Sequence, residues 1–220
     1  MSVGTIDNNA YLRCRTTGEQ LLIDAAADPA TLLEPAGEAG LTSIVATHCH
    51  WAHWTAPAEV ASATGHGRTR SSRRGRRRPA NRPPGNGGDT IRVGEVSVTA
   101  RHLVDHSPGS IALLYRGPSG IRRLFTGDSL FLGWVGDTQK DPARFASLDD
   151  VEKKIFAELP DEAWIYPGDG KDTTLGAERP SLRSGKPTPV EEGRLGPSID
   201  VAGYPNLQGS AFDSLSCSAR

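Results

Sequence analysis

Residues 47–53 read THCHWAH and place three histidines, His48, His50 and His53, directly after the β-branched run Thr42–Thr47. Such a run predicts a buried strand, so the histidines follow a strand end. Alternate side chains of an extended turn point the same way, which puts His48 and His50 on one side. Imidazole is the commonest metal ligand, and a spacing of about two to four residues is usual for zinc. We interpret the cluster as metal-binding; the alternative is a solvent-exposed group of histidines.

Three more residues of ligand type lie further along the chain, each in a turn beside a predicted strand. His106 lies in the sequence DHSPGS, Asp128 in TGDS and Asp169 in YPGDG. Taken singly, each is also an ordinary turn residue. Because loops that follow strands gather at one edge of a sheet, these three residues strengthen the metal-binding interpretation of the histidine cluster.

The hydrophobic pattern along the chain alternates between strands and helices. A helix is predicted over Pro29–Gly40, and a second one from the helical spacing of Leu148, Val151, Ile155 and Leu159. Besides Thr42–Thr47, the predicted strands are Gln20–Asp24, Thr90–Val93, Glu95–Ala100, Ser110–Tyr115, Ile121–Thr126 and Trp164–Tyr166. Strands mixed with helices in this order predict an α/β protein with helices outside a layered sheet.

Length and composition indicate one soluble domain. The chain has 220 residues, a mass of 23.4 kDa and 36% hydrophobic residues, which suits a single core. No apolar stretch approaches the roughly 18 residues of a membrane span, and the N-terminus lacks an export signal. The three widely separated cysteines favour a reducing compartment, so we expect a cytoplasmic protein.

Two segments do not fit a packed domain. Residues 66–88 contain eight arginines and no acid, and residues 181–220 are rich in Ser, Gly and Pro. We expect both segments to be poorly ordered, with the folded domain at residues 1–180. The basic segment has three interpretations: a solvated insertion, a patch at Arg68–Arg82 for nucleic acid or an acidic partner, or the product of a reading-frame slip.

Taken in order, the four motifs resemble those of the metallo-β-lactamase-fold hydrolases, particularly the glyoxalase II-like branch. That family is marked by T-H-x-H-x-D-H, then H-[ST]-P-G-S, then T-G-D, then P-G-H-G. The resemblance runs from about Asn8 to Pro180. It implies an αββα sandwich with a two-metal site, usually zinc, at the edge between the sheets. The sandwich would be incomplete if residues 66–88 replace a core strand.

The resemblance also implies a role for each candidate ligand. His48, His50 and His106 would hold the first metal, His53 would help hold the second, and Asp128 would bridge both. The chain departs from the family pattern at Ala52, where the family has aspartate, and at Asp169, where it has histidine. Both departures affect the second metal, so we expect one well-held zinc and a weak or empty second position. Iron and manganese accept similar ligands.

The resulting functional hypothesis is a hydrolase that uses metal-activated water on a small ester, thioester or lactone, with Asp128 and His53 as catalytic residues. Loss of the aspartate at Ala52 is expected to reduce turnover. The first alternative is an inactive scaffold that binds at most one metal. The second is a protein that binds nucleic acid or an acidic partner through Arg68–Arg82. The sequence determines neither the substrate nor the oligomeric state.

Overall fold

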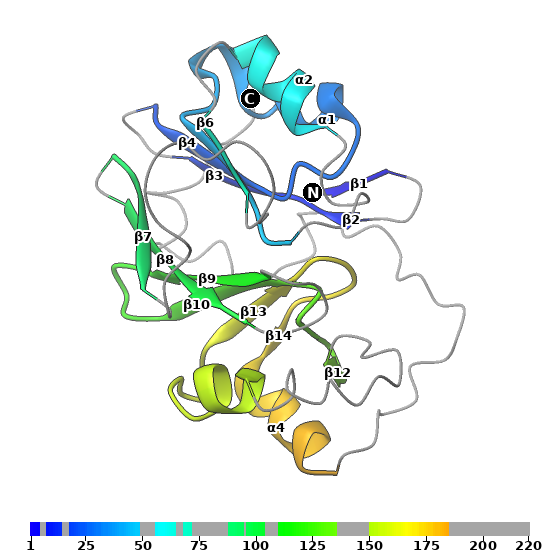
Figure 1. Cartoon of the computed structure of the whole chain (residues 1–220), viewed down its shortest axis with the longest axis vertical. Helices are drawn as coiled ribbons and strands as arrows, with labels where there is room; N and C mark the ends of the chain where they lie inside the picture. The colour runs from blue at the N-terminus through cyan, green and yellow to red at the C-terminus, as the bar shows by residue number, and fades with distance from the viewer. Residues whose placement is uncertain are drawn as a thin grey trace.

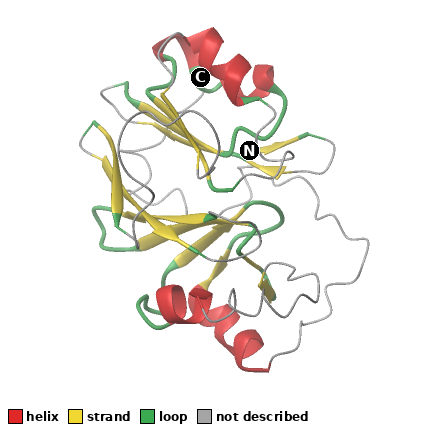
Figure 2. Cartoon of the chain, viewed as in Figure 1, coloured by secondary structure: helices red, strands yellow, loops and turns green. Residues whose placement is uncertain are grey.

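The computed structural model describes the chain in nine stretches that cover most of the predicted domain. They are residues 1–4, 8–14, 18–48, 56–64, 68–71, 88–94, 96–103, 110–135 and 150–184. These stretches form two β-sheets that face each other, with helices on both outer sides (Figures 1 and 2). The predicted α/β class and the αββα layering are therefore confirmed.

One sheet has four strands in the order β3-β4-β5-β6. Their bounds are Tyr11–Cys14, Gln20–Ile23, Ser43–Ala46 and Arg68–Ser71. Strands β4, β5 and β6 run parallel, while β3 is antiparallel to β4. The predicted strands at Gln20–Asp24 and Thr42–Thr47 are thus confirmed as β4 and β5.

Strand β6 lies inside the basic segment. We expected the basic segment at residues 66–88 to be poorly ordered throughout, yet Arg68–Ser71 pair with β5 over its full length. The expectation for this segment considered only apolar burial. An edge strand is also held by its backbone ladder, which does not depend on the side chains.

The other sheet has six strands in the order β14-β13-β10-β9-β8-β7. Their bounds are Thr173–Thr174, Trp164–Pro167, Arg122–Gly127, Ile111–Arg116, Val96–His102 and Asp89–Val93. Both predicted hairpins are confirmed, as β7-β8 and β9-β10. Strand β13 runs parallel to β10, so these two strands end at the same edge of the sheet.

Two small sheets and five helical segments complete the described structure. The small sheets pair β1 (Ser2–Val3) with β2 (Asn8–Asn9) and β11 (Leu130–Phe131) with β12 (Trp134–Val135). The helical segments are α1 (Pro29–Leu33), the 3-10 helix η1 (Gly37–Ala39), α2 (Pro57–Thr64), the π-helix η4 (Glu152–Phe156) and α4 (Leu175–Ser184). Helix α4 extends beyond Pro180, where we expected the folded domain to end.

The helix predicted over Pro29–Gly40 is divided into α1 and η1. Pro35 lies between the two segments, and it has no backbone N–H to continue the helix. The single-helix prediction is therefore wrong at its centre, although both helical pieces lie inside the predicted range.

Three apolar cores hold the four layers together. In β4, Leu21 and Ile23 point into the core between the sheets, while Leu22 points toward α1 and α2. In β9, Leu113 faces the core between the sheets and Leu114 faces η4. This alternation is the period of two that a strand buried on both faces requires. Figure 1 shows α1 and α2 over one sheet and α4 beneath the other.

Aromatic rings connect the two sheets near the edge where β10 and β13 end. The ring of Phe125 lies 5.1 Å from that of Tyr11 and 5.2 Å from that of Tyr166, measured between centroids. Tyr11 and Tyr166 also meet, at 5.7 Å. Tyr11 belongs to the four-stranded sheet and the other two to the six-stranded sheet, so this cluster fixes the separation of the sheets.

Among the described residues, no helix is long and apolar enough to cross a membrane.

We expect Phe125→Ala to lower the free energy of unfolding by about 3 to 5 kcal/mol, because it removes the ring shared by both sheets and leaves a cavity. Leu132→Ala is the control, since Leu132 is 47% exposed. The control is expected to cost less than about 1 kcal/mol. Urea denaturation measures both values, and equal losses would contradict the proposed connection.

Candidate metal centre

Three of the predicted site residues lie in the described stretches, and each follows the end of a strand. His48 follows β5, Asp128 follows β10 and Asp169 follows β13. Because β10 and β13 are parallel neighbours, Asp128 and Asp169 lie at the same edge. The backbone N–H of Ile111 donates to the carbonyl of Thr47 over 2.8 Å, which joins this edge to the end of β5. These three residues therefore lie at the same edge of the sandwich.

His48 and Asp128 are brought into direct contact. The imidazole Nε2 of His48 lies 3.3 Å from Oδ2 of Asp128. The His48 side chain is 1% exposed and that of Asp128 13%. A polar contact so well shielded from water is expected to be strong, because the effective dielectric constant is low there.

A buried carboxylate determines the orientation of His48. Asp24 is 1% exposed and follows β4; it accepts a hydrogen bond from the backbone N–H of Thr47 at 2.7 Å and one from the Thr47 hydroxyl at 2.8 Å. The Thr47 hydroxyl oxygen lies 3.1 Å from Nδ1 of His48. Asp24 and Thr47 therefore support the imidazole from the side opposite Asp128.

The hydrogen bonds that link Asp24, Thr47 and His48 define the tautomer of His48. The Thr47 hydroxyl has a single proton, which it donates to Asp24, so its oxygen can only accept from Nδ1–H of His48. In the neutral imidazole, Nε2 then carries a lone pair that faces the Asp128 carboxylate. Two such acceptors require positive charge between them, either a bound cation or the second proton of an imidazolium.

The spacing of these two acceptors fits a metal ion. Zinc binds imidazole nitrogen and carboxylate oxygen at about 2.1 Å. The two atoms are 3.3 Å apart, so one ion could be held by both. His48 and Asp128 are thus suited to share one ion.

Gly127 allows the turn with Asp128 to approach the histidine. Its φ is +52°, a conformation that disfavours other residues. A Cβ at this position would lie 2.3 Å from the Thr47 hydroxyl oxygen and 3.3 Å from Nδ1 of His48. The glycine of the T-G-D motif is therefore required by close packing against the hydrogen-bond chain that orients His48.

The turn with Asp169 is held by the N-terminal part of the chain. The Asn9 side-chain amide donates to the carbonyls of Pro167 at 3.2 Å and Gly170 at 2.9 Å, and its backbone N–H donates to Gly168 at 2.7 Å. The Tyr11 hydroxyl also donates to Pro167, at 2.7 Å. These contacts leave the Asp169 side chain exposed.

The same turn is joined to the one that carries Asp128. The backbone N–H of Gly168 donates to the carbonyl of Gly127 at 2.9 Å, directly before Asp128. The two candidate carboxylates thus follow backbone segments that are fixed to each other. Sequence reasoning missed the supporting roles of Asp24 and Asn9, although an acid at the end of the apolar run QLLID was a usable signal for Asp24.

The remaining predicted ligands, His50, His53 and His106, lie outside the described residues, as does Ala52. Within the described stretches alone, no group of three or more His, Cys, Asp or Glu side chains is arranged to hold a metal ion. The described part of the predicted ligand set is His48, Asp128 and Asp169, of which the first two are in contact.

Comparison with solved structures identifies the fold. The chain aligns with ETHE1 from Myxococcus xanthus at a TM-score of 0.70 and 26% identity, covering 83% of this chain and 81% of that one. It aligns with TTHA1623 in a di-iron-bound form at a TM-score of 0.60 and 30% identity, covering 81% and 95%. The BLEG-1 B3 metallo-beta-lactamase gives a TM-score of 0.67 at 24% identity, covering 81% and 94%.

Sequence comparison gives shorter matches. A probable hydroxyacylglutathione hydrolase of Schizosaccharomyces pombe is 36% identical over 80 residues, which are 36% of this chain and 30% of the relative. The matches cover less than half the length of such curated relatives. No protein-family model matches the chain.

We expect Gly127→Ala to lower the free energy of unfolding by about 1 to 3 kcal/mol more than Gly120→Ala does, because its methyl group would clash with the Thr47 hydroxyl. Gly120 is a matched control: its φ of +78° gives similar backbone strain, and no atom lies within 4 Å of an added Cβ. Urea denaturation of both variants isolates the clash. Equal destabilisation by the two substitutions would show that the close packing of Gly127 against Thr47 does not contribute to stability.

Proposed function

Because this chain belongs to the metallo-β-lactamase-fold proteins, we propose that it is a metal-dependent hydrolase of small esters, thioesters or lactones. The observation that carries the proposal is the contact between Nε2 of His48 and Oδ2 of Asp128, with the imidazole oriented by Thr47 and Asp24. A histidine nitrogen directed at a carboxylate in this way is the arrangement expected of two ligands to one ion.

In the proposed site, His48, His50 and His106 hold the first metal. Asp128 would contribute to a second metal position as well, where His53 and Asp169 would be the other ligands. Three imidazoles and a carboxylate form a stronger donor set than one imidazole and two carboxylates for zinc, so the first position is the better held.

A metal bound there would lower the pKa of a water molecule and polarise the substrate carbonyl. Several residues of this chain would each support the proposed metal site in a different way. Asp24 accepts from Thr47 and thereby keeps the protonated Nδ1 of His48 turned away from the site. Gly127 lets the Asp128 carboxylate reach Nε2. The family aspartate that helps to orient the water is replaced by Ala52, so we expect slow turnover.

Zinc is the proposed metal, with iron as the alternative. Imidazole-rich sites accept both ions. TTHA1623, which is 30% identical, was solved in a di-iron-bound form. For the substrate, a thioester is the first class to test, because the relative from Schizosaccharomyces pombe is named as a probable hydroxyacylglutathione hydrolase.

The direct test combines metal analysis of the purified protein with a panel of thioesters, esters and lactones. One or two equivalents of metal together with turnover would support the hydrolase. Metal without turnover would support the inactive scaffold instead. Folded protein that takes up neither zinc nor iron would overturn the hydrolase and leave the inactive scaffold.

Ala52→Asp is expected to raise occupancy of the second metal position and to increase turnover, because the new carboxylate restores a ligand and a group that can orient water. Ala58→Asp is the control, since Ala58 is exposed on α2. Elemental analysis and initial rates measure the two effects. No change in either quantity would count against the proposed role of position 52.

Thr47→Val is expected to weaken metal binding by about 10-fold to 100-fold, because it removes the hydroxyl that orients His48 while keeping the side-chain shape. Thr90→Val is the control, since Thr90 is exposed on β7. Titration with zinc in the presence of a competing chelator gives both affinities, and circular dichroism establishes that the variants are folded. Unchanged affinity in Thr47→Val would contradict the proposed role of the Thr47 hydroxyl in orienting His48 for metal binding.

A further inference from the structure

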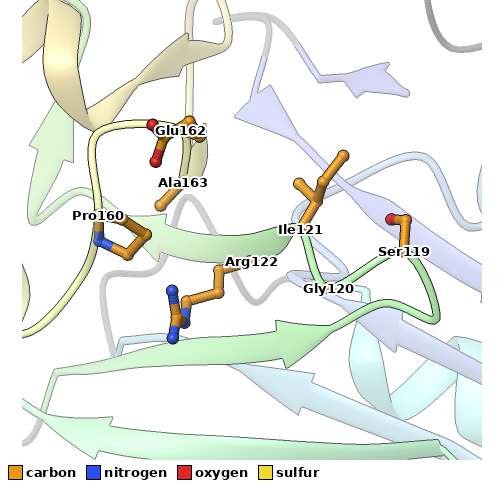
Figure 3. Close-up of a pocket in the computed structure, with 7 residues that line it drawn as sticks. All are labelled: Ser119, Gly120, Ile121, Arg122, Pro160, Glu162 and Ala163. Carbon is orange, nitrogen blue, oxygen red and sulfur yellow. The ribbon is translucent and has the colours of Figure 1, made fainter.

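A second candidate site lies at the opposite end of β10 from Asp128. A hollow of about 300 Å³ is bordered by the β9-β10 turn and by the loop between η4 and β13 (Figure 3). Its lining residues are Ser119, Gly120, Ile121, Arg122, Pro160, Glu162 and Ala163. Arg122 begins β10 and Asp128 follows its end, so the length of the strand separates this hollow from the metal centre. The volume is at the lower limit for small-molecule sites.

Arg122 supplies a positive charge to the hollow. Its side chain is half-buried, and the guanidinium Nε is buried without a hydrogen-bond partner. No ion pair joins Arg122 to another residue in the described stretches. Its cross-strand neighbour Arg116 is exposed and does not line the hollow. Removing a cation from water without compensation is costly, so the hollow favours an anionic group beside Arg122.

Ile121 supplies an apolar wall. Its side chain is 39% exposed, and only Leu132 shares this property among the large hydrophobic residues of the described part. Pro160 and Ala163 line the hollow on another side (Figure 3). A ligand with an aliphatic group would cover the exposed Ile121 surface, which contributes favourable burial of apolar area.

Glu162 supplies a negative charge. It is exposed, and no ion pair joins it to Arg122 or to another described residue. The two opposite charges thus border one hollow without neutralising each other. A simple anion would be attracted by Arg122 and repelled by Glu162, whereas a ligand with both charges would be attracted by each.

We propose that this hollow binds a small zwitterion with an aliphatic side chain, that is, a free aliphatic amino acid. Its carboxylate pairs with the guanidinium of Arg122, its ammonium group with Glu162, and its side chain packs on Ile121. Guanidinium is suited to this role because its parallel N–H donors match the two oxygens of a carboxylate. The site is independent of the metal centre and of the hydrolytic activity proposed above.

Isothermal titration calorimetry of the full chain with L-leucine tests the proposal. Leucine is expected to bind at millimolar concentrations, and Arg122→Gln is expected to weaken binding by about 10-fold to 100-fold, the range for a hydrogen bond to a charged group. Arg116→Gln is the matched control, since it removes an exposed arginine from the neighbouring strand and should leave binding within about twofold.

Two analogues separate the contributions of the ligand. We expect 4-methylpentanoate, which lacks the ammonium group, and 3-methylbutylamine, which lacks the carboxylate, each to bind more weakly than leucine. The proposal would be overturned by absence of leucine binding to the folded wild-type chain, or by equal binding in Arg122→Gln. Equal affinity for 4-methylpentanoate would also overturn it, because Glu162 would then have no part in recognition.

Discussion

The site depends on the buried carboxylate of Asp24. By accepting from both the backbone and the hydroxyl of Thr47, it fixes the first residue after β5 and turns Nε2 of His48 toward Asp128. The carboxylate is 1% exposed, so its charge is little screened and the geometry is tightly held. Through Thr47 and His48, the Asp24 carboxylate beside the four-stranded sheet therefore supports the contact with Asp128, which follows a strand of the six-stranded sheet.

The sandwich supplies the other half of this arrangement. Parallel pairing of β10 with β13 brings the turns that carry Asp128 and Asp169 to one edge. The N-terminal strands reach the same edge, where Asn9 and Tyr11 hold the turn of Asp169. Residues far apart in the sequence therefore converge because strand ends meet there, as the site at a sheet edge requires.

Much of the fold was predictable because the buried strands have short apolar runs with clear turns between them, as in the hairpin around Gly94. Strand β6 was not, because backbone pairing with β5 leaves no hydrophobic pattern in the sequence at Arg68–Ser71. That His48 and Asp128 would lie at one site was expected from the family resemblance of the ordered motifs. The support from Asp24 was not, because a hydrogen bond across 23 positions depends on sheet pairing that no local pattern reveals.

The most direct measurement is X-ray absorption at the metal edge of the purified, metal-loaded protein, compared with its His48→Gln variant. The account predicts nitrogen and oxygen neighbours at about 2.0 to 2.2 Å with outer-shell scattering from imidazole, and a decrease of that scattering in the variant. Identical imidazole scattering in both proteins would contradict it, because the ion would then be bound without His48.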